Sequence, residues 1–156
     1  MTFRTAPHCS KILFMLLMFT SVFSFAARAE ESSFKDHNNK GVQFYNQGDY
    51  ANALTEFKAA FQLAADNAEV ANNIGIVYDE MGDLVNAEKY YKLAISLDPA
   101  NIDAHNNLGV VFFQQNKVEQ ACAEWDMALN VNPNYDEARN NREAGCKRGT
   151  VPFTPS

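Results

Sequence analysis

The sequence between residues 34 and 135 consists of three similar segments of equal length, with a period of about 34 residues, and this repetition constrains the fold more than any other feature. Glycine occupies position eight of each segment, alanine occupies positions twenty and twenty-seven, and aromatic residues occupy positions eleven and twenty-four. In order of position these residues are Gly41, Gly75 and Gly109; Phe44, Tyr78 and Phe112; Ala53, Ala87 and Ala121; Phe57, Tyr91 and Trp125; and Ala60, Ala94 and Ala128. A period of this length predicts a linear stack of similar units.

Each segment is predicted to form a pair of helices. Apolar residues recur at helical spacing, as at Val70 and Ile74. Gly48–Asp49 and Gly82–Asp83 mark turns between paired helices, where glycine adopts the left-handed conformation and aspartate caps the next helix, and Asn116 takes this place in the third segment. We therefore expect helices at residues 34–46, 49–64, 67–81, 84–97, 102–115, 117–131 and 135–148.

The small residues at positions eight, twenty and twenty-seven predict that the two helices of a pair cross closely, since larger side chains there would overpack by about 1–3 kcal/mol. After the third segment, residues 136–141 resemble residues 102–107, but Arg142 and Glu143 then replace a leucine and a glycine. Polar residues at core positions are expected of a helix that caps a stack. Residues 149–156 contain two prolines and no periodicity, so we expect a disordered tail.

These columns resemble the tetratricopeptide repeat over nearly all of the chain after residue 33. The resemblance implies an all-α fold, a right-handed α-solenoid of three helix pairs at residues 34–67, 68–101 and 102–135, closed by a capping helix at residues 136–148. It also implies a protein–protein interaction module whose partner is a protein or peptide client. A structural scaffold subunit that self-associates into a homo-oligomer is the alternative, because a fold does not fix a function.

The resemblance further implies that the first helix of each pair lines a concave groove. Asparagine at position six matches the family's ladder of asparagines that grips an extended peptide, and a carboxamide can bond both N–H and C=O groups of a backbone. We expect peptide contacts at positions six and nine and an acidic groove rim at positions two and twelve. These residues are Asn39, Asn73, Asn107 and Asn141; Val42, Ile76 and Val110; and Glu69, Asp79 and Asp103. Such a groove suits a client with apolar and a few basic side chains; an ordinary surface role for the asparagines is the alternative.

No catalytic or cofactor site is predicted. The sequence shows no glycine-rich phosphate loop, no Ser-His-Asp set and no pocket of paired carboxylates. His37 and His105 occupy the same position of helices two repeats apart, too far from each other to share a metal ion. We therefore expect no enzymatic activity, no cofactor and no bound metal.

The N-terminal segment predicts export. A basic start precedes a largely apolar run at residues 12–25, and Ala27 and Ala29 follow it, which is typical of a signal peptide at residues 1–29. A short linker is expected at residues 30–33. Because a membrane-spanning helix needs roughly 20 apolar residues, we expect no integral membrane anchor after cleavage. The expected location is the bacterial periplasm, with secretion as the alternative.

Export changes the charge balance of the chain. The full sequence has 13 Lys and Arg against 19 Asp and Glu, a net charge of −6. Arg4, Lys11 and Arg28 leave with the signal peptide whereas every acid lies at Glu30 or later, so 10 basic and 19 acidic residues remain and the net charge becomes −9. An acidic protein repels phosphate backbones, so nucleic acid is excluded as a partner.

Two cysteines, Cys122 and Cys146, follow the signal peptide. An even number of cysteines in an oxidising compartment predicts a disulfide. The resemblance to the repeat family places the two residues opposite each other, across the boundary between the third repeat and the capping helix. Two buried free thiols are the alternative, and the lack of a Cys-x-x-Cys motif argues against a redox enzyme.

Overall fold

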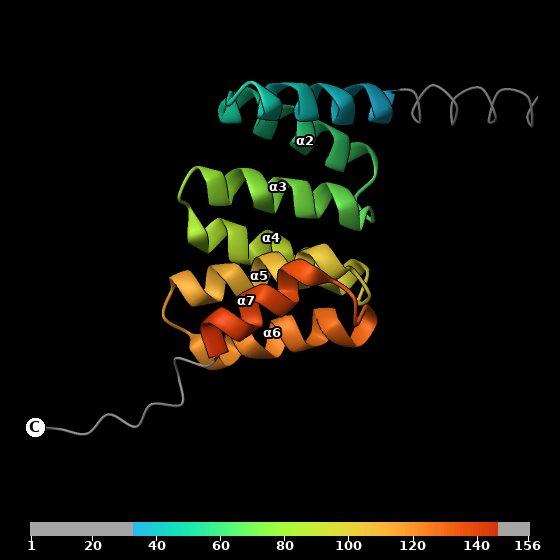
Figure 1. Ribbon diagram of the computed structural model, residues 1–156. Coiled ribbons are helices and arrows are strands. Elements are labelled where there is room, and N and C mark those ends of the chain that lie inside the picture. Colours follow the sequence, from blue (N-terminus) through green and yellow to red (C-terminus); the bar gives the residue numbers. More distant parts are fainter. Residues whose placement is uncertain (1–32, 147–156) are drawn as a thin grey trace, which may run out of the picture.

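The structure of the chain, a computed structural model, describes residues 33–146. These residues form a first helix at residues 33–46 and six further helices, and they contain no strand (Figure 1). The six are α2 (Tyr50–Leu63), α3 (Ala68–Glu80), α4 (Leu84–Leu97), α5 (Ile102–Gln114), α6 (Val118–Val131) and α7 (Asp136–Cys146). The predicted all-α fold is confirmed, and the helix ends differ from the predicted ones by at most one residue inside the described part.

Several predictions fall outside the described residues. They are the signal peptide at residues 1–29, the tail at residues 149–156 and the last two residues of the capping helix. The linker predicted at residues 30–33 is wrong at its final position, because residue 33 already belongs to the first helix. Within residues 33–146, no helix has the length and apolar character needed to cross a bilayer.

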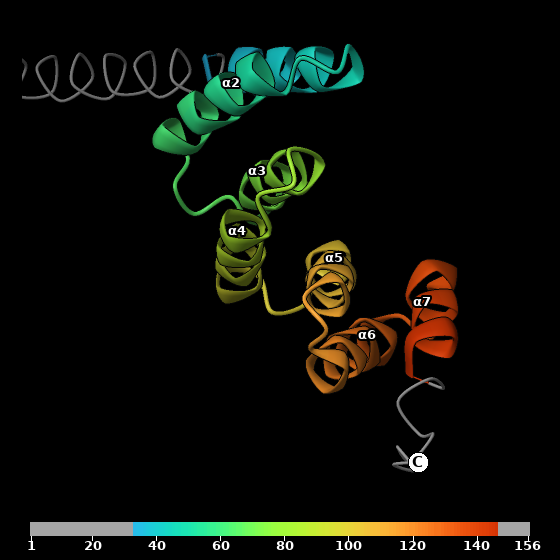
Figure 2. The same ribbon diagram turned by 90° about the vertical axis from the view of Figure 1, so that its left-hand side faces the viewer.

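Successive helices alternate between two sides of the stack. The first helix, α3, α5 and α7 are the leading helices of their repeats, and α2, α4 and α6 are the trailing helices. In Figure 2, α3, α5 and α7 lie toward one side of the molecule and α2, α4 and α6 toward the other. The leading helices therefore share one continuous face, which is turned toward the viewer in Figure 1.

The turns inside each pair form as predicted. Gly48 and Gly82 have φ angles of 74° and 77°, and Asn116 has a φ of 61°. Glycine lacks the Cβ that disfavours this conformation, and asparagine tolerates it better than most residues. Asp49 and Asp83 each accept a hydrogen bond from a backbone N–H three residues on, which caps α2 and α4.

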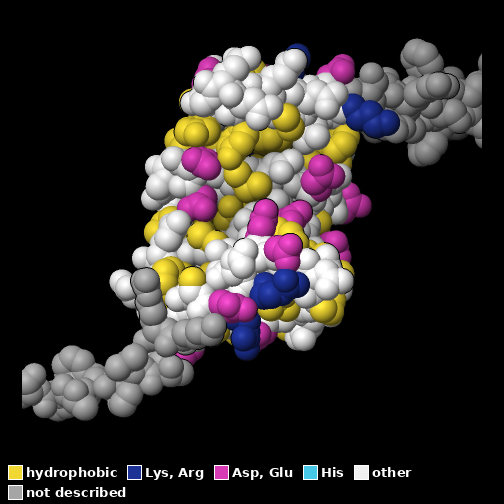
Figure 3. All heavy atoms as spheres, viewed as in Figure 1, with side chains coloured by type: hydrophobic (Ala, Val, Ile, Leu, Met, Phe, Trp, Pro, Cys, Tyr) yellow, Lys and Arg dark blue, Asp and Glu magenta, His cyan; other side chains and the backbone are white. Residues whose placement is uncertain are grey.

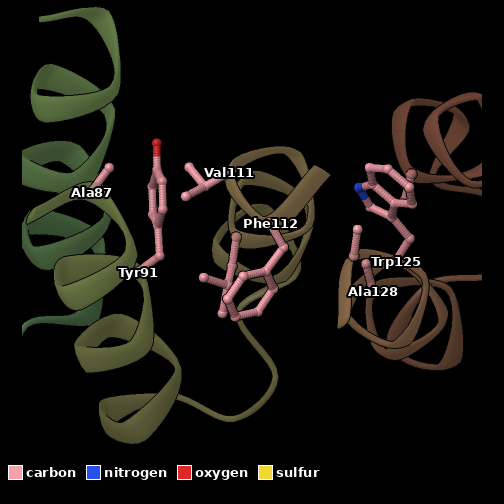
Figure 4. Packing of buried hydrophobic residues seen from close by; sticks show 9 residues of the cluster. Ala87, Tyr91, Val111, Phe112, Trp125 and Ala128 are labelled. Carbon is pink, nitrogen blue, oxygen red and sulfur yellow. The ribbon is translucent and has the colours of Figure 1, made fainter. Parts of the chain in front are cut away.

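The glycines at position eight allow the aromatic rings at position twenty-four to touch the leading helix. A Cβ on Gly75 would lie 2.6 Å from the ring of Tyr91, and one on Gly109 would lie 2.5 Å from the indole of Trp125. The rings of Tyr91 and Trp125 lie on either side of two α5 residues, Val111 and Phe112 (Figure 4). The predicted close crossing is thus confirmed, and the glycine and aromatic columns are two halves of one contact.

The C-terminal end is packed around Trp125. A Cβ on Gly145 of α7 would lie 2.7 Å from the indole, so the ring is held between Gly109 on α5 and Gly145 on α7. Cys122 on α6 and Cys146 on α7 lie next to this contact, with their Cα atoms 5.9 Å apart and their sulfur atoms at bonding distance. This Cα separation is within the range that disulfides span.

Candidate functional site

Two pockets open between the leading helices. The N-terminal pocket, of about 70 Å³, lies between the first helix and α3, and the C-terminal pocket, of about 170 Å³, lies between α5 and α7. Val42, Tyr45, Phe57, Asn73 and Ile76 line the first; Val110, Phe113, Trp125, Asn141, Ala144 and Gly145 line the second. Both contain residues at positions six, nine, twelve and twenty-four, and the C-terminal pocket adds Gly145 at position ten, so the repeat produces two similar pockets.

The pockets bring together most of the residues predicted from positions six and nine. Val42, Asn73 and Ile76 meet in the N-terminal pocket, and Val110 and Asn141 meet in the C-terminal pocket. Figure 3 shows this face of the molecule, with apolar side chains in a band between the upper helices and acidic side chains around it. The lining is mainly apolar, with carboxamides on the α3 and α7 walls, and can therefore hold apolar side chains beside a hydrogen-bonding backbone.

Asn39 and Asn107 complete the predicted ladder but line neither pocket. Asn39 is exposed on the first helix. Asn107 lies on α5, between the two pockets, and is partly buried. The ladder therefore runs along all four leading helices, and two of its members stand at pocket walls.

The ladder has a second function that the sequence interpretation missed. Asn107 Nδ2 donates to Asn72 Oδ1 at 3.4 Å, and Asn141 Nδ2 donates to Asn106 Oδ1 at 3.0 Å. The acceptors, at position five, are only 7% and 5% exposed. The Asn-Asn pair that recurs in every repeat thus joins these leading helices to one another. Its recurrence was visible in the sequence, but nothing there distinguished the buried member from the groove member.

The first repeat boundary lacks this bond. Asn38 Oδ1 is buried without a hydrogen-bond partner among the described residues. The carboxamide of Asn73, which stands where Asn107 and Asn141 stand, is therefore not tied to the preceding helix. It lines the N-terminal pocket with its hydrogen-bonding groups available.

An Asn141→Ala variant is expected to lose about 1–3 kcal/mol of unfolding free energy, because it leaves the buried Asn106 Oδ1 without its donor. Asn73→Ala is the matched control and is expected to change stability by less than about 0.5 kcal/mol, because no such bond is lost there. Urea unfolding followed by circular dichroism measures both. Equal losses in the two variants would contradict the linking role of Asn141.

Tyrosine hydroxyls contact acidic residues on both edges of the groove. The hydroxyl oxygen of Tyr135 lies 2.8 Å from both Asp103 Oδ1 and Glu137 Oε2, so these two acceptors share its single hydrogen. Burial, followed by these two contacts, raises the pKa of Tyr135, which therefore remains a donor. Glu69 is exposed in the first turn of α3. Tyr135 is a residue that sequence reasoning missed, because it closes the third segment, outside the positions expected to face the groove.

The opposite edge of the groove contains Asp79 and Glu80, the last two residues of α3. The hydroxyls of Tyr45 and Tyr50 donate to Glu80 at 3.2 and 3.4 Å. Asp79 is half-buried, and its side chain makes no hydrogen bond with a described residue. Burial, and then the charge of Glu80, raises the pKa of Asp79 above its ordinary value. An acid with a raised folded pKa destabilises the fold when ionised, and this cost is present at neutral pH and lost as the pH falls.

The histidines lie away from the groove contacts. His105 is buried, with Nδ1 2.7 Å from a carboxylate oxygen of Glu124 and Nε2 3.2 Å from the backbone oxygen of Pro99. His37 makes the corresponding contact with Glu56 at 2.7 Å. These pairs join the two helices of a repeat. Residues 33–146 contain no cluster of three or more side chains suited to holding a metal ion.

Comparison with known proteins identifies the architecture. Two models described as the tetratricopeptide repeat match residues 36–100 and 80–141, and together they span more than half of the chain. The TPR domain of Arabidopsis OM64 has a TM-score of 0.74 at 20% identity, covering 76% of this chain and 98% of that domain. No curated protein sequence matches the chain.

Two further solved structures were determined with peptide ligands or partners. The first TPR of Spaghetti (RPAP3), bound to the HSP90 peptide SRMEEVD, has a TM-score of 0.72 at 22% identity and covers 75% of this chain and 93% of that one. The TPR2B domain of yeast Sti1, in complex with pHsp70, has a TM-score of 0.71 at 14% identity, with coverages of 75% and 98%. At these identities the likeness establishes the fold.

Proposed function

Because the chain belongs to the tetratricopeptide repeat family, we propose that it is an adaptor or assembly factor of the cell envelope that binds an extended segment of a client protein. The observation that carries this proposal is the pair of equivalent apolar pockets on the face of the leading helices. The peptides bound by structural neighbours, such as SRMEEVD on Spaghetti (RPAP3), support the same use of the fold.

The binding mode follows from the pocket walls. Apolar side chains of the client enter the two pockets, where Val42 and Ile76 or Val110 and Phe113 contact them. Asn73 bonds the client backbone beside the first pocket, and Asn141 does so beside the second. The backbone contacts do not depend on the client's side chains, so specificity comes from the pockets and the acidic rim.

Val110→Glu is expected to weaken client binding at least tenfold, because it places a carboxylate in the apolar wall of the C-terminal pocket. Val85→Glu is the matched control, since Val85 is 77% exposed on the trailing helix α4, and it is expected to bind as the unaltered protein does. Peptides selected from a displayed random library on the protein produced from its full-length sequence serve as ligands. Their affinities follow from the fluorescence of Trp125, the single tryptophan of the chain, which lines the pocket.

The outcomes separate the possibilities. Selected peptides that bind Val110→Glu and Val85→Glu equally well would place binding outside the groove and remove the proposal. Thermal unfolding of both variants checks that a lost affinity is not lost folding. A protein that retains no peptide at all also contradicts the proposed function.

The cell-envelope location is part of the proposal and rests on residues 1–29. N-terminal sequencing of the protein recovered from its native cell is expected to begin at Glu30. A protein that begins at residue 1 and remains in the cytoplasm would contradict export.

Self-association is the second candidate function. Met127 and Val131 lie one turn apart on α6 and are both exposed, 45% and 41%, so they offer apolar surface to another copy. Light scattering over a range of concentrations tests this: a stable oligomer that no longer binds the selected peptides favours the scaffold over the adaptor.

A further inference from the structure

Position twelve of the leading helices changes its chemistry along the groove. Tyr45 lines the N-terminal pocket and Phe113 the C-terminal pocket. Asp79 occupies the same position of the repeat on α3, midway between them in the sequence. A ligand that follows the leading helices therefore meets an aromatic wall, a carboxylate and a second aromatic wall in that order.

Asp79 shares the repeat position of two pocket-lining residues and has no counter-ion among the described residues. It is half-buried, and the neighbouring Glu80 accepts hydrogen bonds from Tyr45 and Tyr50. Four cations of residues 33–146 are paired with other carboxylates: Lys92 and Lys117 bind Glu88, Arg139 binds Asp136, and Arg142 binds Asp126. The centre of the groove is therefore a place where a cation from outside would be stabilised.

We propose that the groove selects an extended polypeptide segment that carries one lysine or arginine between two apolar side chains. This inference rests on the function proposed above and specifies its ligand. The basic side chain lies against Asp79, and the two apolar side chains enter the N-terminal and C-terminal pockets. Asp103 and Glu137, both in contact with Tyr135, lie in the first turns of α5 and α7, whereas Asp79 lies near the end of α3, so acids border the groove on both edges.

The spacing of the pockets sets the spacing in the ligand. Packed neighbouring helices lie about 8–10 Å apart, so pockets two repeats apart are separated by on the order of 20 Å. An extended chain advances about 3.3 Å per residue, so the two apolar residues stand about six positions apart. Side chains of an extended chain alternate between its two faces, so the basic residue stands two positions from one apolar residue and four from the other, on the face that all three share. An acidic residue at that place would set a second carboxylate against Asp79 and Glu80, which disfavours binding.

The library selection described above tests this specificity directly. Peptides retained by the unaltered protein are expected to be enriched in Lys or Arg between two apolar positions. Asp79→Asn is expected to bind the leading peptide about tenfold more weakly and to select peptides without that enrichment. Asp66→Asn, at an exposed aspartate between α2 and α3, makes the same chemical change outside the groove and is expected to leave affinity and selection unchanged.

Two controls keep the result specific. In the first control, the basic residue of the leading peptide is replaced by glutamine. This peptide is expected to bind the unaltered protein about tenfold more weakly than the leading peptide does. It is expected to bind Asp79→Asn at least as tightly as the leading peptide binds that variant. Asp79→Asn is expected to unfold at an equal or higher urea concentration, because the carboxylate that it removes destabilises the fold at neutral pH. A weaker affinity in that variant is then not a folding defect.

Each contrary outcome has one meaning. Retained peptides that lack a basic residue, or that bind Asp79→Asn unchanged, overturn this inference; if Val110→Glu still abolishes their binding, the groove remains the binding site. Failure to retain any peptide, or binding that ignores Val110→Glu, contradicts the proposed function itself.

Discussion

A Trp125→Ala variant will lose about 3–5 kcal/mol of unfolding free energy, the range measured for removal of a large buried aromatic side chain. Trp125 is 2% exposed, and its indole fills the space between Gly109 on α5 and Gly145 on α7. Its Nε1 also donates to the backbone oxygen of Asn106 at 3.2 Å. The truncation thus removes apolar contacts with two helices and the indole's additional hydrogen bond to the α5 backbone, and the repeat boundary next to the C-terminal pocket opens.

Urea unfolding followed by far-ultraviolet circular dichroism measures this loss, since the variant has no tryptophan fluorescence. Trp125→Phe retains a ring against both glycines and is expected to cost less than half as much. Met127→Ala, on the same helix but 45% exposed, is the matched surface control. A Trp125→Ala variant as stable as that control would show that the ring does not hold the two helices together.

Replacing Cys122 and Cys146 with serine will remove about 3–4 kcal/mol under oxidising conditions, because the proposed disulfide closes a loop across a sequence separation of 24 residues. α7 has no trailing helix of its own in the described part, so the bond to α6 fixes the wall that carries Asn141, Ala144 and Gly145. The double variant is therefore also expected to bind selected peptides more weakly at the C-terminal pocket.

Reductant provides the internal control for this prediction. It is expected to lower the stability of the unaltered protein to that of the Cys122→Ser/Cys146→Ser variant and to leave the variant unchanged. Counting thiols on protein recovered from its native compartment without reductant gives a direct reading. Two reactive thiols, or equal stability of the two proteins under oxidising conditions, would contradict the bridge.

The helices were predictable because the same residue types recur at the same positions in all three repeats. Position eight is always glycine and position twenty-four is always aromatic, as at Gly41 and Phe57. The structure shows the reason, because a Cβ on Gly41 would lie 2.6 Å from the ring of Phe57. A contact that recurs in every repeat leaves a pattern in a single sequence. The turns at Gly48, Gly82 and Asn116 were predictable for the same reason, since each needs a residue that tolerates positive φ.

Features that occur once, or that depend on depth in the fold, were not predictable. Asn106 and Asn107 are neighbours of the same type, and only their placement on α5 makes one buried and the other a member of the groove. Tyr135 joins two acids of the rim from a position that the repeat pattern leaves unassigned. The lack of a counter-ion for Asp79 among the described residues likewise depends on which cations the fold places elsewhere.

The rings at position twenty-four have a consequence for how binding specificity can evolve. Phe57 and Trp125 are core residues by their burial, yet each forms the floor of a pocket. A mutation that reshapes such a floor to suit a new partner also weakens the contact with the glycine beneath, so affinity and folding change together. New specificities are therefore accessible mainly through the less buried positions nine and twelve, as at Val42 and Asp79.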